Sequence, residues 1–253
     1  MKIAVVTGAS SGLGEEYVRV ISEKYDDVEE IWVIARRSDR LDALKERFPN
    51  KKIFPISLDL TKNDSYDTLA SMLESEKPEI KILVNNAGFG TLGDFDTMDM
   101  NTQTRMVDLN NRALTAVTSV SLPYMKKGGF VVNVCSIASF APNPRMTVYC
   151  STKAYVLSFS KSLRFELKKK GINVLALCPG PMDTEFLPAA GIEKGSSRTF
   201  DTLPRVNPAI AAEKSLYYAS KGRGIYTPRV FFKFYRFLAK VLPHGFVMHL
   251  SKT

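Results

Sequence analysis

The chain has 253 residues, of which 45% are hydrophobic and 24% charged, and its formal net charge is +9. This composition is typical of a globular protein that can bury a sizeable core, and one α/β domain over residues 1–253 is the economical interpretation. No stretch approaches the roughly 20 uncharged apolar residues that span a bilayer. Because an apolar strand follows Met1 and Lys2 directly, with no signal-peptide region ahead of it, we expect a cytoplasmic protein.

The cysteines and the positive charge each raise a further class of function. Cys135, Cys150 and Cys178 lack metal-ligand spacing, and both histidines lie near the C-terminus, so we predict buried reduced thiols and no metal site. The basic residues are spread along the chain without a zinc-finger or RNP-like motif. We therefore predict no nucleic-acid partner and look for a smaller phosphate ligand.

Short β-branched runs alternate with longer helical patterns along the chain. The runs are nearly continuous Val, Ile and Leu, which is typical of strands buried on both faces. Their alternation with helices predicts right-handed βαβ crossovers and a doubly wound parallel sheet with helices on both faces. The expected strands span residues 2–7, 31–35, 52–57, 80–85, 129–135 and 173–178. The expected helices include residues 13–25, 103–125 and 151–170.

The first strand ends at Thr7 in a glycine-rich turn that a helix follows at once. Glycines at 8, 12 and 14 permit a tight turn and close backbone approach, and the helix N-terminus offers free N–H groups to a pyrophosphate. The spacing Gly-x-x-x-Gly-x-Gly differs from the more usual Gly-x-Gly-x-x-Gly. Taken alone, the turn also fits a glycine-rich loop without a ligand.

The end of the second strand indicates which dinucleotide the turn would accept. An NAD-binding unit usually presents an acidic side chain there to the ribose 2′-hydroxyl. Here the strand ends with Ala35, Arg36 and Arg37, which removes the carboxylate and supplies guanidinium donors suited to a 2′-phosphate. The pattern favours NADP(H), although both arginines could instead be solvated surface residues.

Two tyrosines are candidates for proton transfer, because each is followed four residues later by a lysine. They are Tyr149 with Lys153 and Tyr217 with Lys221. Residues four apart lie on one face of a helix, so both pairings are geometrically natural. The local pattern does not decide between them.

Several motifs in order give the chain, from Thr7 to about Thr184, a resemblance to the classical short-chain dehydrogenases/reductases, which have the Rossmann fold. Besides the glycine turn, these are Asn85-Asn86-Ala87-Gly88, Asn110, Ser136, Tyr149 with Lys153, and Pro179-Gly180. The resemblance implies a catalytic tetrad of Asn110, Ser136, Tyr149 and Lys153. The cofactor-binding residues that we predict are Gly8, Ser10, Ser11, Gly12, Leu13, Gly14, Arg36, Arg37, Asp59, Leu60, Asn86, Ala87, Gly88, Tyr149, Lys153, Pro179, Gly180 and Thr184.

The resemblance also chooses between the tyrosines. The family places a serine at the end of the fifth strand, 13 residues before its tyrosine, and Ser136 stands at that interval from Tyr149. Tyr217 has no such partner and follows the Pro179-Gly180 motif. The departures from the family pattern are Cys135 for serine, Ala113 for glycine and Ser151-Thr152 for Ala-Ser, and none removes a catalytic group.

These residue types suit transfer of a proton alongside a hydride. A free tyrosine has a pKa of about 10, and we expect the neighbouring Lys153 ammonium and an oxidised nicotinamide to lower that of Tyr149. Ser136 would hydrogen-bond the substrate oxygen. By resemblance, Lys153 would also bind the nicotinamide ribose, and Asn110 would hold a water linking Lys153 to solvent.

We therefore predict an NADP(H)-dependent oxidoreductase acting on a small-molecule ketone or secondary alcohol. One alternative is a 3-oxoacyl thioester reductase, whose acyl carrier or coenzyme A the basic charge would attract. Another is a non-catalytic dinucleotide sensor, which the complete tetrad disfavours. By resemblance we expect a homodimer or homotetramer, paired through the helices that hold Asn110 and Tyr149.

Two later segments bear on the substrate. Residues 181–208 should cover it, and their apolar members suggest an apolar ligand, although such residues also pack on the body of a protein. These members are Met182, Phe186, Leu187, Ile192 and Phe200.

Residues 229–250 form an aromatic and basic tail. A helix there would gather Lys233, Arg236 and Lys240 on one side and leave the apolar residues largely on others. We favour a substrate lid or subunit contact for this amphipathic segment over peripheral membrane attachment or plain core packing.

Overall fold

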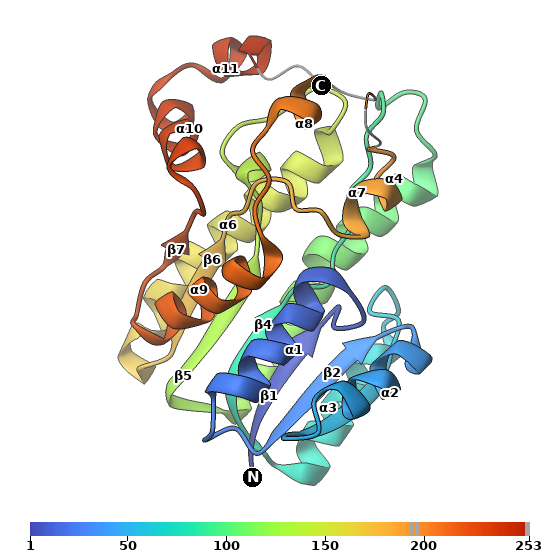
Figure 1. Ribbon diagram of the computed structural model, residues 1–253, viewed down its shortest axis with the longest axis vertical. Helices are drawn as coiled ribbons and strands as arrows, with labels where there is room; N and C mark the ends of the chain where they lie inside the picture. Colours follow the sequence, from blue (N-terminus) through green and yellow to red (C-terminus); the bar gives the residue numbers. More distant parts are fainter. Residues whose placement is uncertain (193–194, 196–197, 251–253) are drawn as a thin grey trace.

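The computed structural model describes residues 1–192, 195 and 198–250, and the sheet within them has seven parallel strands (Figure 1). Their order is β3-β2-β1-β4-β5-β6-β7, so the order reverses between β1 and β4. The strands are β1 Lys2–Thr7, β2 Glu30–Ala35, β3 Lys52–Ser57, β4 Glu79–Asn85, β5 Met125–Val134, β6 Asn173–Leu177 and β7 Ile225–Tyr226. The predicted doubly wound Rossmann sheet is confirmed.

Helices pack on both faces of this sheet. Helices α1 (Gly12–Lys24), α2 (Ser38–Arg47) and α9 (Pro208–Ser220) cover one face. Helices α3 (Asp64–Glu76), α5 (Leu114–Ser121) and α6 (Thr147–Leu167) cover the other. Figure 1 shows further helices gathered at the end where the strands finish. These are α4 Met100–Val107, α7 Phe186–Ala189, α8 Arg198–Thr202, α10 Val230–Val241 and α11 His244–Leu250.

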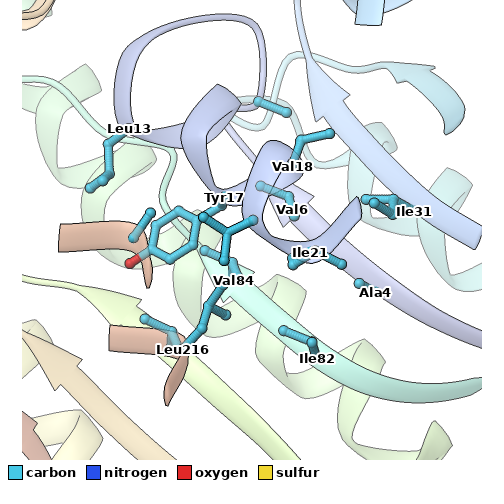
Figure 2. Packing of buried hydrophobic residues seen from close by; sticks show 14 of the residues in the cluster. Ala4, Val6, Leu13, Tyr17, Val18, Ile21, Ile31, Ile82, Val84 and Leu216 are labelled. Carbon is cyan, nitrogen blue, oxygen red and sulfur yellow. The ribbon is translucent and has the colours of Figure 1, made fainter. Parts of the chain in front are cut away.

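The alternation of side chains along each strand builds two cores. On β1, Ala4 and Val6 join the core under α1 and α9, whereas Ile3 and Val5 join the core under α3 and α5. Figure 2 shows the Tyr17 ring of α1 in the first core. Its buried hydroxyl hydrogen-bonds the Ser215 hydroxyl of α9 at 2.8 Å, so the polar atom is satisfied.

The element boundaries differ from the predictions in several places. The expected helix over residues 103–125 is divided into α4, a π-helical turn, α5 and a 3₁₀ turn that ends at Tyr124, and α6 begins at Thr147 rather than 151. Strand β7 was not predicted, because two residues are too few to show a pattern. Strand β5 begins at Met125 rather than 129, and its pairing with β4 shifts register between Ile80 and Ile82, which accommodates the Lys- and Gly-rich residues 126–129.

Candidate active site

A cavity of about 740 Å³ lies at the carboxyl ends of the strands, where β1 and β4 part. Open α/β sheets bind ligands at such a reversal of strand order. Every predicted cofactor-binding or catalytic residue lines this cavity except Gly14 and Asn110. The topology therefore brings to one place residues that are up to 176 positions apart in sequence, from Gly8 to Thr184.

The glycine turn has the backbone that its sequence predicts. Gly8 and Gly12 adopt φ angles of 65° and 55°, the left-handed region that side chains disfavour. A Cβ on Gly14 would lie 2.0 Å from the Gly8 carbonyl oxygen, so Gly14 allows α1 to pack against the turn from outside the cavity. Ser11 precedes α1 without a side-chain cap, which leaves the first-turn N–H groups to another acceptor. This turn fits a pyrophosphate.

Thr7 and Asn86 join the turn to the neighbouring strand β4. The Asn86 amide donates to the backbone oxygens of Thr7 and Gly8 at 3.1 and 3.0 Å. The Thr7 hydroxyl in turn accepts hydrogen bonds from the backbone N–H groups of Asn86 and Ala87. The segment after β4 is thereby held against the cofactor turn.

Arg37 lies across the glycine turn. Its guanidinium donates to the Ser10 hydroxyl at 3.0 Å and to the Ser11 hydroxyl at 3.0 Å. The same group pairs at 3.0 Å with Glu185, a carboxylate that also pairs with Arg40. Arg37, two hydroxyls and the Glu185 carboxylate thus meet at one end of the cavity, with Arg40 behind Glu185. The guanidinium and the hydroxyls suit a phosphate ester.

Arg36 is exposed and lines the same end of the cavity, opposite Asp59. Burial tends to raise the pKa of Asp59, but hydrogen bonds from the Thr61 N–H and hydroxyl and the Arg36 charge outweigh it and hold the pKa below its usual value. Asp59 is therefore ionised and anchors its loop beside the end of the cavity that Arg36 lines.

Ser136 and Tyr149 come from different elements and meet inside the cavity. Ser136 follows β5, and its hydroxyl accepts a hydrogen bond from the Ala138 N–H at 3.1 Å. Tyr149 lies in the first turn of α6 and is only 8% exposed. Burial raises the pKa of Tyr149 well above its usual value, and the nearby Ser136 side chain opposes part of the rise.

Lys153 lies one turn further along α6 and is buried. Its ammonium donates to the Val134 carbonyl at 2.9 Å and lies 5.8 Å from the centre of the Tyr149 ring. Burial lowers the pKa of Lys153. The expected lowering of the Tyr149 pKa by Lys153 is not seen in this geometry, because desolvation of the phenol dominates. The Cys135 thiol donates to the Lys153 carbonyl at 3.1 Å, so this departure from the family pattern helps hold α6 to β5.

Asn110 supports the site from outside the cavity. It lies in a π-helical turn, Asp108–Ala113, of the kind found at functional sites. Its side chain accepts from the Phe89 N–H at 3.0 Å and donates to the Phe89 carbonyl at 2.9 Å and to the Thr152 hydroxyl at 3.0 Å. These contacts hold residues 88–89 against α6, beside Lys153.

A buried row of polar side chains fixes the helices behind the site. The Asn85 amide donates to Thr118 of α5 and to Asn133 of β5, both at 2.9 Å. Asn133 donates in turn to Ser160 of α6 at 2.9 Å. These directional bonds fix the register of α5 and α6 on the sheet, while the buried Asn85 Oδ1 has no hydrogen-bond partner.

Much of the remaining cavity wall is apolar. All five apolar residues predicted within 181–208 line it, although residues 193, 194, 196 and 197 of that segment lie outside the described part of the chain. Helices α10 and α11 add a second group, namely Phe231, Phe232, Tyr235, Leu238, Leu242 and Val247. A Cβ on Gly180 would lie 2.2 Å from the Phe232 ring, so this glycine makes room for α10.

Sequence reasoning missed three contributors to the site: Arg40, Glu185 and Phe232. Arg40 and Glu185 are 145 residues apart, and neither belongs to a local motif. Phe232 was assigned only to an amphipathic tail. A helical pattern shows which residues share a face but not which face meets the site.

Within residues 1–192, 195 and 198–250, no helix is long and apolar enough to cross a bilayer. The same residues contain no group of three or more His, Cys, Asp or Glu side chains that could hold a metal ion. All three cysteines are buried and free, as predicted.

Comparison with known proteins agrees with this geometry. Residues 2–194 match the family model for short chain dehydrogenase. A serine 3-dehydrogenase of Agrobacterium fabrum is 35% identical over 215 residues, which cover 82% of each chain. A short-chain dehydrogenase from Sphingobium yanoikuyae, solved in complex with NADPH, is 30% identical with a TM-score of 0.78 over 91% of this chain and 89% of that one.

A third relative is the bulky-bulky ketone specific alcohol dehydrogenase of Comamonas testosteroni. It is 27% identical, with a TM-score of 0.75 over 98% of this chain and 94% of that one. The chain therefore belongs to the short-chain dehydrogenase/reductase family and is an oxidoreductase of that family. A nicotinamide dinucleotide cofactor is supported by both the family and the shape of the glycine turn.

Proposed function

We propose that this protein is an NADP(H)-dependent oxidoreductase that reduces a ketone of an apolar substrate or oxidises the corresponding secondary alcohol. The observation that carries the NADP(H) assignment is the position of Arg37, whose guanidinium lies over Ser10 and Ser11 with Arg40 behind it. The exposed Arg36 adds a second cation at the same end. The NADPH complex of the Sphingobium relative agrees with this proposal.

When bound, the cofactor would supply the hydride and, in its oxidised form, a positive charge beside Tyr149. The glycine turn would hold the pyrophosphate, and Lys153 would hold the nicotinamide ribose. Because burial keeps the Tyr149 phenol protonated, it is suited to donate its proton to a carbonyl oxygen as that carbonyl is reduced. Ser136 would orient this oxygen and stabilise the developing negative charge.

The apolar wall supports an apolar substrate. Met182, Phe186, Leu187, Ile192 and Phe200 line the same cavity as Tyr149 and Ser136, together with residues of α10 and α11. The Tyr149 ring lies 5.9 Å from that of Phe186. The bulky-ketone specificity of the Comamonas relative is consistent with such a space. A panel of ketones, steroids and oxoacyl thioesters, followed by NADPH absorbance, tests this assignment. Turnover of small polar carbonyls alone would contradict it.

Cofactor choice is tested by binding. Arg37→Ala and Arg36→Ala should each weaken NADPH and leave NADH nearly unchanged, because a charge-assisted hydrogen bond contributes about tenfold to a hundredfold in affinity. Quenching of protein fluorescence would give both dissociation constants. Lys45→Ala is the control, since this exposed lysine of α2 pairs with Asp42 and does not line the cavity. Parent protein that prefers NADH would overturn the assignment.

We also propose that the protein is a homodimer or homotetramer. The two helical segments expected to pair carry exposed large apolar side chains. Val107 ends α4, directly before the turn that contains Asn110, and Tyr155 and Phe165 lie on α6 with Tyr149. Light scattering should give a multiple of the 28.2 kDa chain mass, and Phe165→Glu should reduce it. A monomeric parent would contradict this proposal.

A further inference from the structure

Helix α10 has three different faces. Phe232 and Ala239 are buried against the protein, while Lys233, Arg236 and Lys240 form a basic stripe on one side. The remaining face carries large apolar side chains that are at least 54% exposed, namely Val230, Phe231, Phe234, Phe237 and Val241. The spacing of 230, 234, 237 and 241 places these residues in one row along the helix.

This exposed row is unusual for a protein surface. Single exposed apolar residues are normal, but a contiguous row of aromatic side chains marks an interaction surface. Phe246 of α11 extends it, since it is 55% exposed on the next helix. Figure 1 places α10 and α11 at the end of the molecule opposite the N-terminus. A lid over the cavity would use the inner side of α10 and would not explain this outer row.

The charge of residues 229–250 indicates which kind of surface the exposed row on α10 binds. Residues 229–250 contain four Lys or Arg residues and no Asp or Glu. A second copy docked antiparallel by the same face across a twofold axis would bring the two basic stripes to the same side of the interface, where residues 229–250 offer no carboxylate to pair with them. An anionic surface suits both features, since aromatic side chains enter a lipid interface and basic ones meet its headgroups.

We propose that α10 and α11 attach this protein to the surface of an anionic membrane without crossing it. Phe231 lies on α10 next to the exposed row, is 54% exposed, and also lines the active-site cavity. Attachment through this row therefore places one side of the cavity next to the lipid, from which an apolar substrate would enter. The attachment itself does not depend on the reaction proposed above.

Vesicle flotation tests the proposal with the full chain. The parent should float with vesicles of equal parts phosphatidylcholine and phosphatidylglycerol and much less with phosphatidylcholine alone. The double variant Phe234→Glu/Phe237→Glu should lose on the order of tenfold or more in partitioning, because it removes two rings from the interface and adds like charge. Neither residue lines the cavity, so NADPH binding serves as the check that the variant is folded.

Two further variants separate the contributions of the row and the stripe. Lys233→Gln/Lys240→Gln should weaken binding to the anionic vesicles and reduce its dependence on salt. Phe95→Glu, an exposed aromatic in the loop before α4, is the matched control and should bind like the parent. A parent that does not float, or a double variant that floats equally well, would overturn the proposal. A double variant that instead loses oligomeric mass would assign the row to contact between copies and would also overturn it.

Discussion

Tyr149 with Lys153 and Tyr217 with Lys221 share the same spacing, and in both pairs the ammonium nitrogen lies 5.8 Å from the centre of the tyrosine ring. Their surroundings differ. Tyr149 is 8% exposed and lines the cavity beside Ser136, whereas Tyr217 is 50% exposed on α9 and lies outside it. Lys221 is exposed, whereas Lys153 is buried and bonded to a strand carbonyl.

This difference shows that pair geometry alone does not make an acid–base site. Burial removes water from Tyr149 and Lys153. It raises the pKa of Tyr149 and lowers the pKa of Lys153, so both side chains favour their neutral forms. The cavity then brings Ser136 within reach of the same phenol. The second pair serves as an internal control, because a substitution of Tyr149 or Lys153 can be matched by the same substitution of Tyr217 or Lys221.

The first predicted effect that separates the pairs is on turnover after loss of the lysine. Lys153→Met should reduce kcat about a hundredfold or more. The variant removes the positive charge beside the Tyr149 ring and the group that is expected to hold the nicotinamide ribose. NADPH oxidation with the best ketone of the panel measures it. Lys221→Met should keep parental activity. Equal losses in the two variants would mean that general damage, and not the site, is responsible.

The second prediction concerns stability and pH. Burial lowers the pKa of Lys153 in the folded chain below its ordinary 10.5, and the unfolded chain keeps the ordinary value. Between the two values the unfolded chain binds more protons, so the free energy of unfolding of the parent should rise with pH relative to that of Lys153→Met.

Urea denaturation at neutral pH and about one unit below the ordinary lysine pKa gives this comparison. The free energy of unfolding of the parent minus that of Lys153→Met should rise with pH. A difference that falls as pH rises would show that the folded state favours the charged lysine.

The third and smallest effect concerns Glu185, whose carboxylate pairs with Arg37 and Arg40 where the 2′-phosphate would bind. Glu185→Gln should tighten NADPH about twofold to fivefold and leave NADH unchanged, because exposed ion pairs contribute up to about 1 kcal/mol. Titrations of both cofactors measure it, with Glu213→Gln as the control, since this exposed glutamate pairs with Lys24 away from the cavity. Weaker NADPH binding would mean that Glu185 holds Arg37 in place for the phosphate.

The sequence predicted much of this molecule because its strongest signals are local. Buried strands, the glycine turn and the Tyr149 and Lys153 spacing each lie within a few residues, and six of the seven strands follow from them. The contacts of Glu185 with Arg37 and of Asn110 with Phe89 and Thr152 depend on how distant segments pack. The outward face of α10 is similar, because the pattern showed an amphipathic helix but not which apolar residues the fold would leave exposed.

The most direct test of the central claim is single-turnover oxidation of bound NADPH in Tyr149→Phe and Tyr217→Phe. Both variants keep the ring, and only one removes a hydroxyl from the cavity. Tyr149→Phe should bind NADPH like the parent and oxidise it about 10²–10⁴-fold more slowly when the ketone is added, whereas Tyr217→Phe should match the parent. Near-parental oxidation by Tyr149→Phe would contradict the assignment of Tyr149 as the proton donor.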